Sequence, residues 1–312
     1  MSSSPAVSIC IPAYKQPEML KRCLDSIRQQ TFTDIEVIVT DDSPGDEVAR
    51  LVDSYKDILP IRYKHNVPSL GTPENWNEAI RQATGKYIKL IHHDDWLATP
   101  NALQKLHDAL EAAPGSDFAY ARALLVYDDG KEWLLPMKIE NLDRVRREPE
   151  YVMVVKPIST PSVTLFRNKF MYDNRMKWLV DIDGYIHELY RNPAIVCVNE
   201  PLVKVGIHAY QVTQECEDNK EVDVKEHIQL LDKLRPGTLR KWLYYDYFWR
   251  LLRRYGIRSS EELTALAKGF PVHRELYRMA AFQSKLPASL WTKGIISKTG
   301  MFLCYLTSLL NK

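Results

Sequence analysis

Short apolar runs alternate with amphipathic stretches through the first hundred residues of the chain. The apolar runs are brief, which is typical of buried strands, whereas the stretches between them repeat apolar residues at helical spacing. The predicted strands lie at 7–11, 35–39, about 61–63 and 87–91. The predicted helices lie at 18–30, about 47–55 and about 73–83. This order predicts an α/β fold with a mostly parallel sheet and right-handed crossovers.

The second half of the chain follows a different pattern. Residues 118–208 mix short strands with loops, and from about residue 224 onward the spacing is helical. A long aromatic-rich helix is expected around 242–254, and two shorter ones around 261–268 and 272–284. Because 312 residues exceed the usual size of one domain, we expect a domain over 1–215 and a helical region over 216–312.

Composition indicates an ordinary soluble globular protein, with 45% apolar and 26% charged residues. The five cysteines are scattered and form no CxxC pair, so neither a disulfide framework nor a zinc knuckle is indicated. No signal peptide is recognisable, and the expected compartment is the cytoplasm. The net charge of +2 is uneven, because residues 225–312 carry an excess of about +10 and residues 1–224 therefore about −8. Nothing in the sequence indicates a nucleic-acid partner.

Two acidic loops follow strands of the predicted sheet. Asp41 and Asp42 come directly after the second strand, and His92-His93-Asp94-Asp95 follows the strand at 87–91. Carboxyl ends of parallel strands share one edge of a sheet, so a single ligand can touch both loops. Carboxylate oxygens suit Mg²⁺ or Mn²⁺, ions that commonly handle phosphate. No GxGxxG follows the first strand and no GxxxxGK[ST] occurs, which argues against a dinucleotide Rossmann site and a P-loop.

Several further motifs keep the order and spacing of a known family. They are Val7–Tyr14, Gln30–Ser43, Gly71, Asn75, Asn77, Ala79, Gly85–Tyr87 and Asp94-Asp95. Together these residues resemble the inverting glycosyltransferases of family 2, which have the GT-A fold. The resemblance is strong over 6–112 and weaker over 160–213. It implies a catalytic domain with a nucleotide half at about 6–112 and an acceptor half at about 113–215.

The resemblance also implies a nucleotide-sugar site. Pro12, Ala13 and Tyr14 are expected along the base and ribose, and Asp42 is expected to accept a hydrogen bond from uracil or thymine N3–H. Asp41 is a further candidate, although a structural role in the turn stays open for it. The remaining candidates for nucleotide-sugar binding are Asn75 and Asp94.

The metal motif of the family is Asp-x-Asp, and His92 stands here in place of its first Asp. By the resemblance, Asp95 ligates Mn²⁺ or Mg²⁺ and Asp94 supports it. His208, in the loop 208–213 that resembles the one closing over the diphosphate, is the second ligand candidate, with a structural role left open. We expect His92 and His93 to be supporting or core-facing residues.

Inversion requires a base that deprotonates the acceptor hydroxyl. In the family this is an Asp at the start of a helix, commonly after Glu, and Val180 stands here in the place of that Glu. Asp181 is the first candidate for the base and Asp183 the second. The alternative is a helix start whose first turn happens to be charged. Residues 159–167 resemble the segment that lines the acceptor side.

The expected function is metal-dependent, inverting transfer of a sugar from a UDP- or dTDP-linked donor to a glycan or lipid-linked glycan, in surface polysaccharide synthesis. Two alternatives stay open. His92 and Val180, which depart from the motifs, keep a catalytically silent nucleotide-sugar-binding or membrane scaffold protein possible. A metal-dependent hydrolase would instead use His92, His93, Asp94 and Asp95 as ligands.

The region 285–310 is rich in apolar residues. Its uncharged run at 299–310 is too short to span a bilayer, which needs about 20 apolar residues. Trp291, Lys293 and Lys298 suit a segment that lies in the membrane interface, so we expect a peripheral contact with the inner face of the membrane. The alternative is that these helices pack on the catalytic domain or form a homo-oligomer.

Overall fold

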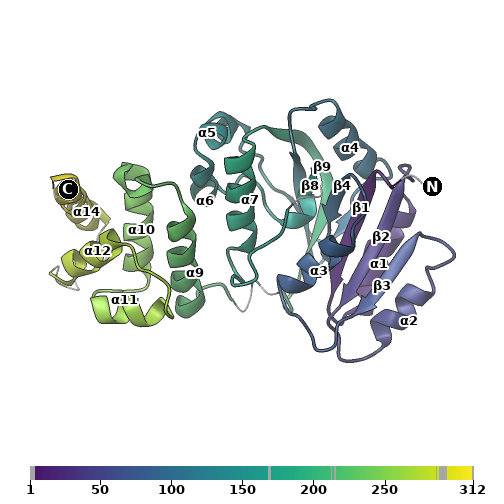
Figure 1. The fold of residues 1–312 in the computed structure, drawn as a ribbon, viewed down its shortest axis with the longest axis horizontal. Helices are drawn as coiled ribbons and strands as arrows, with labels where there is room; N and C mark the ends of the chain where they lie inside the picture. The colour runs from purple at the N-terminus through teal and green to yellow at the C-terminus, as the bar shows by residue number, and fades with distance from the viewer. Residues whose placement is uncertain are drawn as a thin grey trace. The chain divides into compact units, whose positions relative to one another are not determined.

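The computed structural model describes residues 4–167, 170–211, 213, 216–285, 287 and 294–310 (Figure 1). The chain divides into two compact units, Met1–Gln211 and Val212–Lys312. The expected boundary was after residue 215, within the same connection.

The first unit is built on one twisted sheet that combines strands from its whole length. In space the strands follow the order β3-β2-β1-β4-β8-β6-β9-β5, with β7 paired to β6. The strands are β1 (Val7–Ala13), β2 (Ile35–Asp41), β3 (Ile61–His65), β4 (Tyr87–Leu90), β5 (Trp96–Leu97), β6 (Phe118–Tyr127), β7 (Glu132–Leu134), β8 (Thr164–Arg167) and β9 (Ile195–Ile207). All four strands predicted in the first hundred residues are present.

The parallel part of the sheet positions the site. β1 pairs in parallel with both β2 and β4, and β2 pairs in parallel with β3. The chain moves outward from β1 to β2 and β3 and then returns to β4 on the other side of β1. With right-handed crossovers, this reversal places the helices before and after it on opposite faces of the sheet. The carboxyl ends of β1 and β4 therefore form the switch point where open α/β sheets bind ligands.

The first unit has seven α-helices in its described part, of which α1 to α4 pack on strands of the sheet (Figure 1). They are α1 (Pro17–Arg28), α2 (Glu47–Asp53), α3 (Glu74–Gln82), α4 (Ala102–Glu111), α5 (Leu142–Arg147), α6 (Val152–Val155) and α7 (Val180–Arg191). α3 packs on β1 and β2, and α4 packs on β6 and β9. All seven residues of β1 are buried, as expected for a central strand covered on both faces.

The other half of the sheet is mixed, and it was less visible in the sequence. β8 is antiparallel to both β4 and β6, while β6 and β9 run parallel over ten residue pairs interrupted by register shifts after Ala121. The short β5 and β7 are antiparallel to β9 and β6. The sheet is thus parallel around the switch point and mixed beyond β4.

The second unit is helical. Its helices are α9 (Lys220–Lys233), α10 (Trp242–Arg254), α11 (Ser260–Leu266), α12 (Arg274–Ser284) and α14 (Gly294–Leu310). The predicted aromatic-rich helix is α10, whose Tyr244, Tyr245, Phe248 and Trp249 are almost fully buried. α14 packs against α10 and α12. Leu290, Trp291 and Lys293, on which part of the membrane expectation rests, lie outside the described residues. Among the helices that are described, none has the length and apolarity to cross a bilayer.

Candidate functional site

Loops from four strands meet at the switch point. The backbone N–H of Asp42, after β2, donates to Ala13 O at the end of β1 (3.0 Å). The backbone N–H of Ile91, after β4, donates to Cys10 O of β1 (3.0 Å). The backbone N–H of Gly206, near the end of β9, donates to Asp95 Oδ1 (3.2 Å). The two acidic loops and the end of β9 therefore belong to one site.

Asp42 organises the loop that follows β3. Its Oδ1 accepts hydrogen bonds from Asn66 Nδ2 (2.8 Å) and Leu70 N (3.0 Å), and its Oδ2 accepts one from Gly71 N (2.7 Å). Gly71 has a φ of 72°, a left-handed conformation that glycine adopts without strain. Because a carboxylate can accept about four hydrogen bonds, one acceptor position on Asp42 remains.

Asp41 lies beneath this loop and is fully buried. Its Oδ2 accepts a hydrogen bond from Tyr63 OH (2.7 Å) and its Oδ1 one from Ser43 N (2.8 Å). A nucleotide would find no exposed atom of this carboxylate. The structure thus favours the structural alternative for Asp41, which we had also considered for nucleotide binding.

Of the other nucleotide candidates, only Tyr14 presents an exposed side chain. Its ring is 48% exposed and lies beside Lys15 Nζ, 4.8 Å from the ring centroid. Pro12 and Ala13 are buried. Asn75 is also buried, and it donates from Nδ2 to Ala13 O (3.2 Å) and accepts at Oδ1 from Asn66 (2.9 Å). Asn75 and the strand end therefore support the loop that carries Tyr14.

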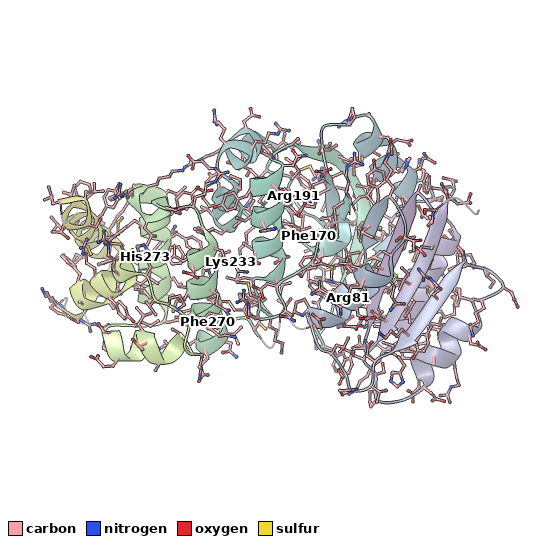
Figure 2. The ribbon with its side chains drawn as sticks, viewed as in Figure 1. Arg81, Phe170, Arg191, Lys233, Phe270 and His273 are labelled. Carbon is pink, nitrogen blue, oxygen red and sulfur yellow. The ribbon has the colours of Figure 1, made fainter. Side chains whose placement is uncertain are left out.

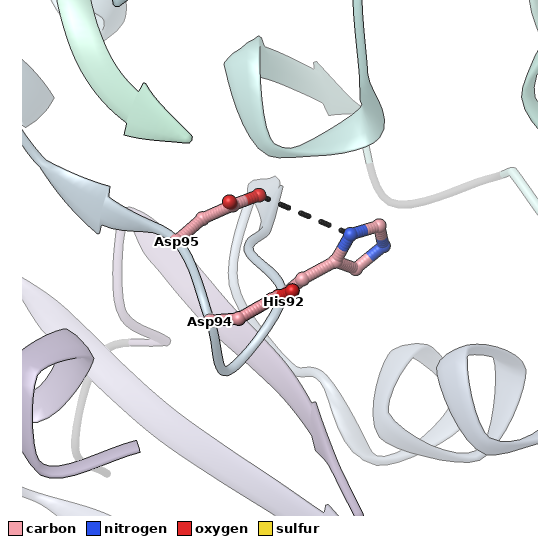
Figure 3. A group of neighbouring side chains, drawn as sticks. All are labelled: His92, Asp94 and Asp95. Atoms are coloured by element: carbon pink, nitrogen blue, oxygen red, sulfur yellow. Dashed lines mark ion pairs between the residues drawn. The ribbon is translucent and has the colours of Figure 1, made fainter. Parts of the chain in front are cut away.

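His92, Asp94 and Asp95 form the compact polar group of the site (Figure 3). One potential ligand atom from each residue lies within 4.8 Å of the others, and His92 Nδ1 is 3.9 Å from Asp95 Oδ2. His92 Nε2 is buried and has no hydrogen-bond partner in the described part of the chain. One imidazole nitrogen and carboxylate oxygens fit a hard divalent cation such as Mn²⁺. The sequence assigned His92 only a supporting role, yet its ring lies in this group.

His208 lies next to the group through Asp94. Its Nε2 is 2.9 Å from Asp94 Oδ2 and its side chain is buried. It does not belong to the compact group of three among the described residues, although we expected it as a ligand. Gly206 permits this approach of β9, because a Cβ there would lie 2.7 Å from Asp94 O. His208 therefore orients Asp94.

The two carboxylates differ in ionisation. Burial acts to raise the pKa of Asp94, but the hydrogen bond with His208 and the nearby His93 and His92 outweigh it, so this pKa lies below its usual value. Burial and the charge of Asp94 raise the pKa of Asp95 well above its usual value. Burial lowers the pKa of His92 to about 4, so its ring is neutral at pH 7 and can offer a lone pair. Of the three potential ligands, Asp94 is therefore the one whose ionised form the surroundings favour most.

The neighbours His93 and Lys89 hold the loop from behind. His93 turns away from the group, with Nδ1 3.3 Å from Pro12 O and Nε2 3.2 Å from Gln16 Oε1. Lys89 of β4 is fully buried and donates to Ser162 O, and burial lowers its pKa to about 7. The hydrolase alternative requires that all four residues of 92–95 are metal ligands. His93 points to Pro12 and Gln16 instead, so its ring is not available to the ion in this structure.

An aromatic wall connects the polar group with the start of α7. The Trp76 ring lies 4.7 Å from the His92 ring and meets Tyr172 edge-on at 5.2 Å between centroids. Asn77 fixes Tyr172 with two hydrogen bonds to its backbone, each 2.8 Å. The wall thus runs from His92 to Tyr172, and burial and then the charge of Asp181 raise the pKa of the Tyr172 hydroxyl.

Asp181 and Asp183 occupy the first turn of α7. Asp181 accepts from the backbone N–H of Ile182 (2.8 Å), and burial raises its pKa to about 6. Asp183 is buried, and its backbone N–H closes the first turn by donating to Leu179 O (2.9 Å). Phe170, labelled in Figure 2, packs against Gly184 of the same helix so closely that no side chain fits there. Asp181 therefore has a perturbed pKa and a fixed position.

The segment 159–167 supports the site from below. Ser162 is fully buried; its Oγ accepts from His92 N (3.0 Å) and its carbonyl accepts from Lys89. Sequence reasoning named the segment of Ser162 only as a candidate for the acceptor side, and it missed Trp76 and Tyr172 as parts of the site. Two weak signals were available in the sequence. Lys89 lies inside an apolar run and, if buried, needs a hydrogen-bond acceptor, and Trp76 is an aromatic residue within the apolar stripe of a helix.

This sheet, with its reversal at β1 and β4 and an acidic loop at the switch point, has the GT-A fold, the nucleotide-binding α/β fold found in glycosyltransferases. The chain belongs to glycosyl transferase family 2, whose sequence model matches residues 8–174. An uncharacterised glycosyltransferase of Rickettsia prowazekii is 30% identical over 225 residues, which are 67% of this chain and 66% of that protein. The chain thus spans about two thirds of that relative.

Two solved structures share the fold. The Staphylococcus aureus TarS fragment 1–349 in complex with UDP-GlcNAc has a TM-score of 0.64 at 15% identity, over 96% of this chain and 89% of that one. The mannosyltransferase PcManGT of Pyrobaculum calidifontis, in complex with GDP-Man and Mn²⁺, has a TM-score of 0.55 at 15% identity, over 100% of this chain and 89% of that one. The GT-A fold expected from the sequence is confirmed.

Proposed function

We propose that this glycosyltransferase is inverting and metal-dependent, and that it transfers a sugar from a UDP- or dTDP-linked donor to an acceptor hydroxyl. The observation that carries the proposal is the group of His92, Asp94 and Asp95 at the switch point, with Asp181 joined to it by the aromatic wall. In this proposal residues 6–112 bind the nucleotide, 113–215 the acceptor, and 216–312 form a separate helical region.

The donor would bind along the loop after β1. Tyr14 offers an exposed ring for the base or ribose, and Asp42 retains one acceptor position for the N3–H of uracil or thymine. Asp41 and Asn75 would act indirectly, by holding the loops on which these two residues depend. The fold relatives TarS and PcManGT were solved with UDP-GlcNAc and GDP-Man, which supports a nucleotide-sugar donor and leaves its base to experiment.

His92, Asp94 and Asp95 would hold the divalent ion, Mn²⁺ or Mg²⁺, while His208 fixes the orientation of Asp94. When bound, such an ion neutralises the charge that develops on a departing diphosphate, so no general acid is needed for the leaving group. The backbone N–H of Gly206 and the hydroxyl of Ser162 hold Asp95 and His92 in place. The chain thereby keeps the three potential ligands preorganised.

Asp181 would take the proton of the acceptor hydroxyl as the oxygen attacks the anomeric carbon from the side opposite the leaving diphosphate. A base whose pKa is raised to about 6 is a stronger proton acceptor than an exposed aspartate and is still ionised at neutral pH. Asp183 is the second candidate. The acceptor in this proposal is a glycan or lipid-linked glycan of a surface polysaccharide.

The rival function is a nucleotide-sugar-binding protein without catalysis. Two specific replacements favour it, His92 for the first Asp of the metal motif and Val180 for the Glu before the base. The position of His92 within the polar group, where its Nδ1 lies 3.9 Å from Asp95 Oδ2, favours the catalytic proposal instead. The two functions differ in one observable, which is turnover of the donor.

The test compares Asp95→Asn with the wild type in a screen of UDP-, dTDP- and GDP-sugars with Mn²⁺. Loss of the ligand should abolish transfer, since a Lewis-acid metal typically supplies several kcal/mol of transition-state stabilisation. Asp108→Asn, an exposed aspartate on α4, is the matched control and should transfer normally. Activity of Asp95→Asn within tenfold of the wild type would contradict the metal assignment. Donor binding by the wild type without turnover on any acceptor supports the silent binding protein.

A further inference from the structure

One face of α14 is apolar and exposed. Its large apolar side chains are between 40% and 85% exposed, namely Ile295, Phe302, Leu303, Leu306, Leu309 and Leu310. At helical spacing these residues fall on one side of the helix and form a continuous stripe. We call these six residues the α14 stripe. Soluble proteins rarely leave an apolar patch of this extent exposed without a binding function.

The opposite face of α14 fixes the orientation of the stripe. Met301 and Cys304 are fully buried there, and Tyr245 OH lies 3.0 Å from Cys304 Sγ. Trp249 Nε1 donates to Ser297 Oγ (3.1 Å) within the same unit. Rotation of the helix to bury the stripe would break both contacts and expose the core of the helical unit. The stripe is therefore a fixed surface of this unit.

Cationic side chains border the stripe, and α14 itself contains no Asp or Glu. Lys298 is exposed on the helix, and Arg240 and Lys241 are exposed beside it, where Tyr305 OH donates to Arg240 O (2.6 Å). Glu275 of the neighbouring α12 is buried and ion-paired with Arg278 at 3.0 Å. The charge of Glu275 is thus balanced by Arg278, and the border stays positive.

An aromatic residue completes the border. The Trp242 ring is half-buried and meets Phe302 at 5.2 Å and Tyr305 at 5.4 Å between centroids. An apolar stripe with cationic and tryptophan edges matches the boundary between acyl chains and anionic headgroups, where each of these groups finds its preferred surroundings. A protein partner would have no need of the cationic border.

We propose that the α14 stripe docks the helical unit on the surface of a bilayer that contains anionic lipid, with α14 lying in the plane of the interface. Apolar burial would supply most of the binding and the cationic border would select anionic lipid. The inference does not depend on the proposed chemistry, because it rests on the second unit alone. It specifies which face of the region 285–310 makes the membrane contact expected from the sequence.

The test is co-sedimentation of the full chain with vesicles of equal parts phosphatidylglycerol and phosphatidylcholine, and with vesicles of phosphatidylcholine alone. The wild type should pellet with the anionic vesicles, less at high salt, and much less with the neutral ones. Absence of binding to the anionic vesicles at low salt would overturn the proposal. Equal binding to both kinds of vesicle would contradict the proposed role of the cationic border in selecting anionic lipid.

The paired variant Leu303→Gln/Leu306→Gln removes two members of the stripe. It should lower the vesicle partition coefficient by at least about tenfold, because each leucine loses its apolar transfer into the interface. The matched control is Trp133→Gln/Leu134→Gln, an equally exposed apolar pair on β7 of the first unit, which should bind vesicles as the wild type does. If the stripe variant pellets like the wild type, the contact lies elsewhere and the proposal is wrong.

Two measurements guard against other occupants and against misfolding. Hydrogen–deuterium exchange of the unmodified chain should slow in residues 294–310 when anionic vesicles are added, and not in α11, which serves as the internal reference. Unchanged exchange in 294–310 would overturn the proposal without any mutation. Light scattering without lipid tests a second copy of the chain: a dimer that the stripe variant dissociates, together with unaltered vesicle binding, would assign the stripe to self-association instead.

Discussion

Replacement of Asp181 by Asn tests the proposed base most directly. The substitution keeps the size of the side chain and the helix start at α7 but removes the proton acceptor. Loss of a positioned general base typically lowers the rate by about 10²–10⁴-fold, or about 3–5 kcal/mol in the barrier. Because Asp181 belongs to the acceptor side of the proposed site, binding of the donor nucleotide with Mn²⁺ should stay unchanged.

The raised pKa of Asp181 gives this prediction a second, independent readout. A base acts only when it is deprotonated, so activity should rise with pH through the pKa of about 6. From pH 7 to pH 5 the ionised fraction falls from about nine tenths to about one tenth, so kcat/KM should fall about tenfold. An aspartate with an ordinary pKa of about 3.9 would lose less than about a tenth of its ionised form over the same range.

The assay measures initial rates of sugar transfer between about pH 5 and pH 8 at saturating Mn²⁺, with donor binding followed separately by calorimetry at each pH. Asp183→Asn, two positions further along the same helix, is the matched control and should retain the fall below pH 6. The reasoning fails if Asp181→Asn keeps kcat within tenfold of the wild type. A larger loss in Asp183→Asn than in Asp181→Asn would exchange the two roles.

Three further predictions concern residues that hold the site. Asn77→Ala should lower the free energy of unfolding by about 2–4 kcal/mol in urea denaturation, because two buried backbone groups lose their partner, whereas the exposed Asn174→Ala should change it by less than about 0.5 kcal/mol. Burial lowers the pKa of Lys89 to about 7, against about 10.4 in the unfolded chain, so the unfolded chain binds more protons between these two pH values. The free energy of unfolding of the wild type, relative to that of Lys89→Met, should therefore rise between about pH 7 and pH 9. A difference that does not change with pH would contradict this prediction. Gly206→Ala would bring a Cβ to 2.7 Å from Asp94 O. It should weaken the binding of Mn²⁺ in the presence of UDP by about tenfold, measured by calorimetry. An unchanged affinity would show that the loop of Asp94 moves aside without loss of the ion.

The fold was accessible from the sequence because local patterns carry it. Short apolar runs such as 35–39, rich in β-branched residues and bounded by polar loops, favour buried strands, and helices between them impose parallel pairing. No local sequence pattern predicts that β8 lies antiparallel between β4 and β6. This position depends on long-range pairing of Phe166 with both Ile88 and Phe118, which the run Thr164–Arg167 alone does not reveal.

The parts of the site differ in the same way. Asp42 and Asp95 stand close behind predicted strands, and this position in the sequence predicted that both lie at the site. The partners of Asp42, at Asn66, Leu70 and Gly71, come from a loop more than twenty residues away, and no local pattern links them. The surroundings of His92 depend on residues equally far away: the hydroxyl of Ser162 accepts a hydrogen bond from its backbone N–H, and its role as ligand or support stays a prediction.

The replacement of an Asp by His92 changes the charge balance of the site in a way that fits a nucleotide-sugar enzyme. The His92 ring is neutral at pH 7, and the ionised Asp94 raises the pKa of Asp95, so the group without ligands holds less negative charge than three carboxylates would. A site of low charge attracts a divalent cation weakly by itself, and because burial and the charge of Asp94 raise the pKa of Asp95, a proton competes with the ion for this carboxylate. A diphosphate supplies the missing negative charge, so cation and nucleotide should strengthen the binding of each other. This cooperation distinguishes the proposed transferase from a resident-metal hydrolase, which would hold its ion tightly before any substrate arrives.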